Sequence, residues 1–119
     1  MNEHPGAGQR IIDEATSWPG VEAVRGDRGE LSLRLGKREL GHLHGDHALH
    51  IGFPKGVWHD LHDDGRIDYH PIFPGRPGWG SRRLDDAGDE RDAIALLRLN
   101  YDRAVANHGV PAGAGGARG

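Results

Sequence analysis

Cysteine is absent from this chain of 119 residues. Disulfide bonds, thiolate nucleophiles and thiolate zinc sites are therefore excluded together, because each of them requires a cysteine sulfur. The chain also lacks any run close to the roughly 20 apolar residues that span a membrane. Its opening sequence, MNEHPGAGQR, has no apolar segment typical of a secretory signal. We therefore expect a cytoplasmic protein that does not contact a membrane.

An excess of positive charge is also missing. The chain has 15 Lys and Arg against 18 Asp and Glu, for a formal net charge of −3, whereas nucleic-acid-binding proteins usually carry a basic excess. It contains neither a Gly-x-Gly-x-x-Gly motif before a helix nor a Walker-type phosphate loop. Its serines, Ser17, Ser32 and Ser81, lie in no nucleophile motif. We therefore expect neither a nucleic-acid partner nor a nucleotide cofactor.

The length suits one domain, since typical domains have roughly 100–150 residues. We expect a single α+β domain over residues 9–108, with a flexible N-terminus (1–8) and a disordered Gly/Ala-rich tail (109–119). The element order α-β-β-β-β-α-β-β-α favours an antiparallel sheet of about five strands packed with two to three helices. The predicted helices cover residues 9–18, 54–64 and 90–107, and the predicted strands cover 21–25, 30–35, 39–44, 47–53, 66–73 and 79–84.

Two of these elements have the clearest patterns. Apolar and polar residues alternate from residue 30 to Leu35, which is typical of a half-buried strand. Apolar residues three and four positions apart between Ile94 and Val105 predict the C-terminal helix. Asp89 is its expected N-cap, because its carboxylate can accept from the unpaired N–H groups of the first turn.

Histidine is abundant, with 9 residues, and His42 and His44 form the pair of greatest interest. On a strand they project to the same face, roughly 6.6 Å apart along the chain. This spacing allows two imidazoles to bind one metal ion, with a third ligand from His47, His50, His70 or a carboxylate. Zinc suits three such ligands and an open water position.

The same pair is open to other interpretations. Without a metal, one imidazole could act as a base and another as an acid, because histidine titrates near neutral pH. The two residues could equally be ordinary half-buried strand residues. Leu40 shares the parity of the histidines and Leu43 does not. We expect the imidazoles to line a pocket if Leu40 faces the core, and to face solvent if Leu43 does.

A set of short motifs follows in a characteristic order along the chain. They are Glu39-Leu40-Gly41-His42-Leu43-His44, Phe53-Pro54 before a helix, His70 with Pro74, Gly78-Trp79, and Leu96-Leu97-Arg98-Leu99-Asn100-Tyr101. Over about residues 9–106, this set resembles the small bacterial and fungal "luciferase family" domain. The resemblance implies a compact α+β domain, and it highlights His42, His44, His70 and Trp79. It implies no particular reaction, because light-emitting chemistry is not established for the family.

The chain departs from this family in the loop before Gly78-Trp79. The family usually has Leu-Pro-Asp-Ser there, whereas this chain has Phe73-Pro74-Gly75-Arg76-Pro77. The acidic residue is lost and a cation is gained. We therefore expect Arg76 to hold an acidic group of a ligand.

Three functional hypotheses follow. The first is a pocket for a small organic molecule, with no cofactor. Its catalytic residues would be His42, His44 and His70, and its substrate-binding residues would be Trp79, Arg76 and Tyr69. The second is a mononuclear zinc site built on His42 and His44. The third is an interaction or regulatory module without chemistry, and the sequence predicts no oligomeric state for any of the three.

Overall fold

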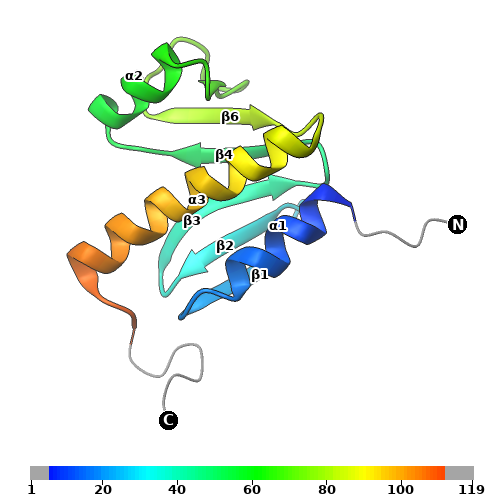
Figure 1. Cartoon of the computed structure of the whole chain (residues 1–119), viewed down its shortest axis with the longest axis vertical. Helices are drawn as coiled ribbons and strands as arrows, with labels where there is room; N and C mark the ends of the chain where they lie inside the picture. Colours follow the sequence, from blue (N-terminus) through cyan, green and yellow to red (C-terminus); the bar gives the residue numbers. More distant parts are fainter. Residues whose placement is uncertain (1–5, 112–119) are drawn as a thin grey trace, which may run out of the picture.

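The computed structural model describes residues 6–111 (Figure 1). Most of the expected flexible N-terminus and of the expected tail lies outside the described residues. The described part forms a single α+β domain, as the sequence predicts. None of its helices is long and apolar enough to cross a membrane.

The elements follow the predicted order, with six strands in the sheet where about five were expected. The helices are α1 (Ala7–Thr16), α2 (Lys55–Asp63) and α3 (Ala87–His108). The strands are β1 (Val21–Arg25), β2 (Leu31–Leu35), β3 (Arg38–His44), β4 (Ala48–Gly52), β5 (Asp68–Tyr69) and β6 (Trp79–Arg83).

All neighbouring strands are antiparallel, in the order β1-β2-β3-β4-β6-β5. The helices α1 and α3 pack against each other and cross the same face of the sheet (Figure 1). The domain therefore has two layers. One face of the sheet is covered by helices, and we call the opposite face the open face.

The core fills the space between the sheet and the helices. Alternate residues of β2 and β4 supply its floor, including Leu33, Leu49 and Ile51, which are fully buried. Leu96 and Leu97 of α3 pack onto them from above. This arrangement confirms the apolar stripe that the sequence predicts for the C-terminal helix.

A β-bulge in β3 changes which residues face the helices. Leu33 of β2 pairs with Gly41, and the next residue, Arg34, pairs with Glu39, so that Leu40 is left as an extra residue on β3. Leu40 and Leu43 are consequently both buried. The expectation that only one of these two leucines faces the core was wrong, because it assumed an unbroken alternation along the strand.

Two predicted boundaries need correction. The N-cap of α3 is Asp86, whose carboxylate accepts from the backbone N–H of Asp89. The strand predicted for residues 66–73 is only two residues long, and residues 70–78 form turns. Pro71, Pro74 and Pro77 explain this shortening, because proline has no N–H to donate to a neighbouring strand.

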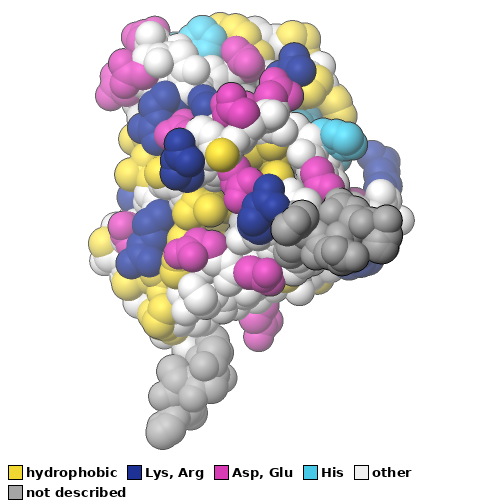
Figure 2. Space-filling model, turned by 45° about the vertical axis from the view of Figure 1, so that its right-hand side comes forward, with side chains coloured by type: hydrophobic (Ala, Val, Ile, Leu, Met, Phe, Trp, Pro, Cys, Tyr) yellow, Lys and Arg dark blue, Asp and Glu magenta, His cyan; other side chains and the backbone are white. Residues whose placement is uncertain are grey.

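Charged side chains of both signs alternate on the surface shown in Figure 2. Several charged residues of the domain form ion pairs between distant elements. Arg10 pairs with Glu90 at 2.8 Å, and Arg82 pairs with Asp89 at 2.7 Å. These contacts connect α1 and β6 to the start of α3.

Candidate functional site

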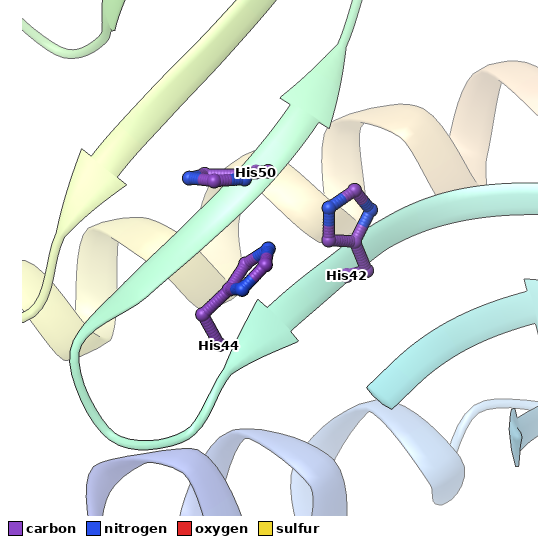
Figure 3. Close-up of side chains that lie close together, drawn as sticks. All are labelled: His42, His44 and His50. Carbon is purple, nitrogen blue, oxygen red and sulfur yellow. The ribbon is translucent and has the colours of Figure 1, made fainter. Parts of the chain in front are cut away.

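Three imidazoles meet on the open face of the sheet, where β3 and β4 lie side by side (Figure 3). His42 and His44 are alternate residues of β3 and therefore share a face, as the sequence predicts. His50 of β4 pairs directly with His42 across the two strands. Paired residues of neighbouring antiparallel strands point to the same side of the sheet, so all three rings lie next to one another on the open face.

The rings lie close enough to share one ion. Each offers a nitrogen, and the three nitrogens lie within 4.8 Å of one another. Zinc–nitrogen bonds of about 2.0–2.1 Å in a tetrahedral site place the nitrogens about 3.4 Å apart. The longest separation must therefore shorten by at most about 1.4 Å. Of the three side chains, that of His44 is exposed and has room to rotate toward the other two.

His50 is the most enclosed member of the cluster. His50 lies between the core residues Leu49 and Ile51 in β4, so its side chain points to the opposite face of the sheet. It is only 8% exposed. Its ring lies 4.2 Å from that of His70, measured between centroids. Among residues 6–111, its buried Nδ1 has no hydrogen-bond partner. A buried nitrogen without a partner is unfavourable by about 1–3 kcal/mol, so this nitrogen is available to a ligand.

His42 is held by a carboxylate. Its Nδ1 lies 2.8 Å from Oε2 of Glu39, and Glu39 also accepts from the hydroxyl of Ser32 at 2.8 Å. The contact with His42 is the main reason why the pKa of Glu39 is lowered. Glu39 and His42 would lie on opposite faces of a regular strand, and the bulge at Leu40 brings them to the same one.

The hydrogen bond to Glu39 has a consequence for the ring of His42. Because Nδ1 is engaged, Nε2 is the nitrogen left for a ligand. A carboxylate behind a metal-binding imidazole orients the ring and raises its basicity, and it recurs in protein metal sites.

The other imidazoles favour the neutral form. Burial lowers the pKa of His50 to about 4, with a further contribution from the imidazoles around it. Burial also lowers the pKa of His44 and of His70, and in both cases His42 adds to the effect. A neutral imidazole has a free lone pair, which is the form that binds a metal ion or accepts a proton.

A hollow of about 410 Å³ opens beside the cluster, which is in the usual size range of small-molecule sites. One wall is the turn at residues 70–73, which connects β5 toward β6 and carries His70, Ile72 and Phe73. The complete lining comprises Arg28, Glu30, His42, His44, His50, His70, Ile72 and Phe73. The imidazoles on the open face are therefore beside a cavity even though Leu43 faces the core.

Of the six residues proposed from the sequence, three line the hollow and three lie outside its lining. Trp79 is on the open face, with its ring 6.2 Å from that of His70 and 6.4 Å from that of Phe73, so it supports the wall from behind. The guanidinium of Arg76 lies 5.7 Å above the ring of Phe73. Tyr69 pairs with Gly80 and packs on Trp58 and His62.

The lining residues that the sequence reasoning missed are Arg28, Glu30, Ile72 and Phe73, and it also missed Glu39 beside His42. His50 was only one of several possible third ligands. A signal for His50 was present. If the hairpin closes by pairing His44 with Ala48, as it does, then His50 falls opposite His42. Gly45, with a φ of +58°, allows the tight turn that fixes this register.

A model of the Luciferase domain family matches residues 37–100, which is more than half of the chain. The chain belongs to the Luciferase domain family. The matched segment of this Luciferase domain runs from the start of β3 into α3, and it includes all four imidazoles of the hollow. No curated protein and no solved structure matches the chain. The family name by itself assigns no reaction to these residues.

Proposed function

We propose that this Luciferase domain binds a small organic molecule in the open-face hollow, beside a metal ion of the zinc type held by His42, His44 and His50. One observation carries the proposal: three imidazole nitrogens from two adjacent strands lie within 4.8 Å of one another. Three nitrogen ligands leave one position of a tetrahedral ion open. The same three histidines line the hollow.

Three features support a metal ion over a chance cluster. Nδ1 of His42 is held by a carboxylate, as in many metal sites. The lowered pKa of His50 keeps its ring free of a competing proton near neutral pH. Nδ1 of His50 is buried without a hydrogen-bond partner among the described residues, so it is not taken up by another group of the protein.

When bound, a zinc-type ion would supply Lewis acidity toward an oxygen of the bound molecule or toward a water. The residues of the chain would supply the rest. Glu39 orients His42, and the turn at 70–73 shields the cluster from one side. His70 lines the same hollow without being one of the three proposed ligands.

The decisive experiment is elemental analysis of protein that has been purified without a histidine tag and then dialysed against zinc. We expect one zinc ion per chain in the wild type and its loss in His50→Ala. His47→Ala is the matched control, because His47 is an exposed histidine in the same hairpin but outside the cluster. A wild-type protein that binds no stoichiometric transition metal, or equal binding by both variants, would refute the metal site.

A second candidate function is acid–base chemistry without a metal. The observation that favours it is the direct contact between the imidazoles of His50 and His70, with ring centroids 4.2 Å apart in the wall of the hollow. One ring could accept a proton from a bound molecule while another donates one. An activity that survives complete removal of metal by a chelator, and is lost in His70→Ala, would favour this candidate over the metal site.

A further inference from the structure

His70 differs from the other three imidazoles of the hollow. It comes from the turn after β5 and not from the β3–β4 hairpin, and it is not one of the three proposed metal ligands. It is only 6% exposed, yet it lines the hollow. Those polar atoms of such a side chain that are buried need hydrogen-bond partners.

One of its two ring nitrogens has a partner within the turn. The backbone N–H of Ile72 donates to Nδ1 of His70 at 3.1 Å. A nitrogen that accepts a hydrogen bond carries no proton, so the ring is neutral and its single proton is on Nε2. The turn therefore fixes His70 as a hydrogen-bond donor through Nε2.

The Nε2–H group of His70 keeps some exposure to solvent. Among residues 6–111 it has no hydrogen-bond partner, and it is not one of the buried side-chain atoms left without one. The hollow is the open space that His70 lines. A donor fixed in this way selects for a ligand with an acceptor at the same place.

The same turn offers an apolar surface. Ile72 is 70% exposed and Phe73 is 37% exposed, and both line the hollow next to His70. A second hydrogen bond, from the N–H of Phe73 to the carbonyl of His70 at 3.0 Å, holds these side chains at a fixed distance from the imidazole. A ligand that covers them would gain binding free energy by removing their apolar surface from water.

We propose that the hollow takes a small organic molecule with an oxygen acceptor and an apolar body, such as an aromatic or branched carboxylic acid. His70 donates from Nε2–H to the oxygen, and the apolar body lies on Ile72 and Phe73. The inference rests on the small-molecule part of the proposed function and makes His70 the residue that sets ligand specificity. Arg28 and Glu30 at the rim carry opposite charges, so the selection comes from the donor and the apolar wall.

The first test is NMR of the ¹⁵N-labelled histidine rings in metal-free protein. We expect the Nε2–H tautomer for His70, and we expect added benzoate to shift its Nε2 resonance. Benzylamine has the same ring but an ammonium donor in place of the acceptor, and it should cause no such shift. An Nδ1–H tautomer, or equal shifts with both compounds, would overturn the inference.

A pair of variants separates the two nitrogens of His70. His70→Asn retains an oxygen near Nδ1, which can accept from Ile72 as in an Asx turn, but it removes the donor at Nε2. His70→Gln places an amide N–H near Nε2 and removes the acceptor for Ile72. We expect His70→Asn to weaken benzoate binding roughly ten- to hundredfold, while His70→Gln stays close to the wild type.

Equal benzoate affinity in His70→Asn and the wild type would refute the role of His70. If both variants fail to fold, the tautomer and the benzoate shift of the wild type decide the question alone. Zinc binding is measured on the same samples and should be unchanged in His70→Asn. If the wild type binds no zinc but His70→Asn weakens benzoate binding, only the metal site is refuted. If the wild type binds zinc but His70→Asn leaves benzoate binding unchanged, only this inference is refuted.

Discussion

The two faces of the sheet are built from the same strands but differ in almost every physical property. The covered face is apolar and closed by α1 and α3, with residues such as Leu33 and Leu49 fully buried. The open face carries His42, His44 and His50, which meet beside a hollow. In β4 the two faces alternate residue by residue, since His50 lies between Leu49 and Ile51. The apolar packing that stabilises the fold is therefore on one face of the sheet, and the candidate site is on the other.

The strongest test of this division compares one deletion on each face. Leu97→Ala on α3 removes a fully buried side chain that packs on the sheet, and we expect it to destabilise the fold by about 2–5 kcal/mol. His44→Ala removes an exposed side chain, and we expect a change within about 0.5 kcal/mol. Urea unfolding followed by tryptophan fluorescence measures both. Comparable losses in the two variants would show that the open face is also part of the stabilising core.

The open face should also make stability depend on pH. The pKa of His50 is lowered to about 4 in the folded chain, against about 6.5 for an unperturbed histidine. Above pH 6.5 the ring is neutral in both states. As pH falls from about 6.5 to about 4, the unfolded chain takes up the proton first and stability is lost, by up to about 3 kcal/mol. His44 and His70, whose pKa values are also lowered, act in the same direction.

The measurement is urea unfolding of metal-free protein at a series of pH values. His50→Asn should flatten the dependence between about pH 6.5 and 4, because the variant has no proton to bind at this position. Below that window the lowered pKa of Glu39 adds a further loss of stability as its carboxylate is protonated. A wild type and a His50→Asn variant with the same slope would contradict the enclosed, neutral state of His50.

The covered face was largely predictable from the sequence. Burial of one side of a strand or helix produces a period of 2 or 3.6 residues, and the patterns ending at Leu35 and at Val105 are both of this kind. The element order and the shared face of His42 and His44 followed from the same periodicity. The wrong N-cap, Asp89 in place of Asp86, arose because several acidic residues precede the apolar stripe and local pattern does not choose among them.

The open face depends on features that periodicity does not contain. The position of Glu39 beside His42 requires the bulge at Leu40, and the position of His50 requires the register of the hairpin. The wall at residues 70–73 comes from a turn in place of the predicted strand. Tyr69 pairs with Gly80 and therefore lies on the covered face, whereas Trp79 lies on the open face. Only the pairing of β5 with β6 shows this difference. The bulge, the hairpin register and the position of Tyr69 depend on how strands pair, whereas the turn follows from its prolines.

Gly41 lies next to the bulge in β3, on the covered face, and its replacement is expected to cost less than the loss of Leu97. A Cβ at this position would lie 2.9 Å from Cδ2 of Leu97 and 3.2 Å from the carbonyl oxygen of His50. Gly41→Ala should therefore push α3 away from the bulge and destabilise the fold by about 1–3 kcal/mol. Zinc binding should weaken as well, because the bulge holds Glu39 and His42 on one face.

A second variant separates the two contacts of the added Cβ, one with Leu97 of α3 and one with the carbonyl oxygen of His50 in β4. In a Leu97→Ala background the nearest atom is gone, so the additional cost of Gly41→Ala should shrink, and the two changes should not be additive. Urea unfolding of the two single variants and the double variant gives this coupling directly. If Gly41→Ala has the same cost with and without Leu97, the strain lies in the strand pairing around His50, and the packing of α3 is not what requires glycine at this bulge.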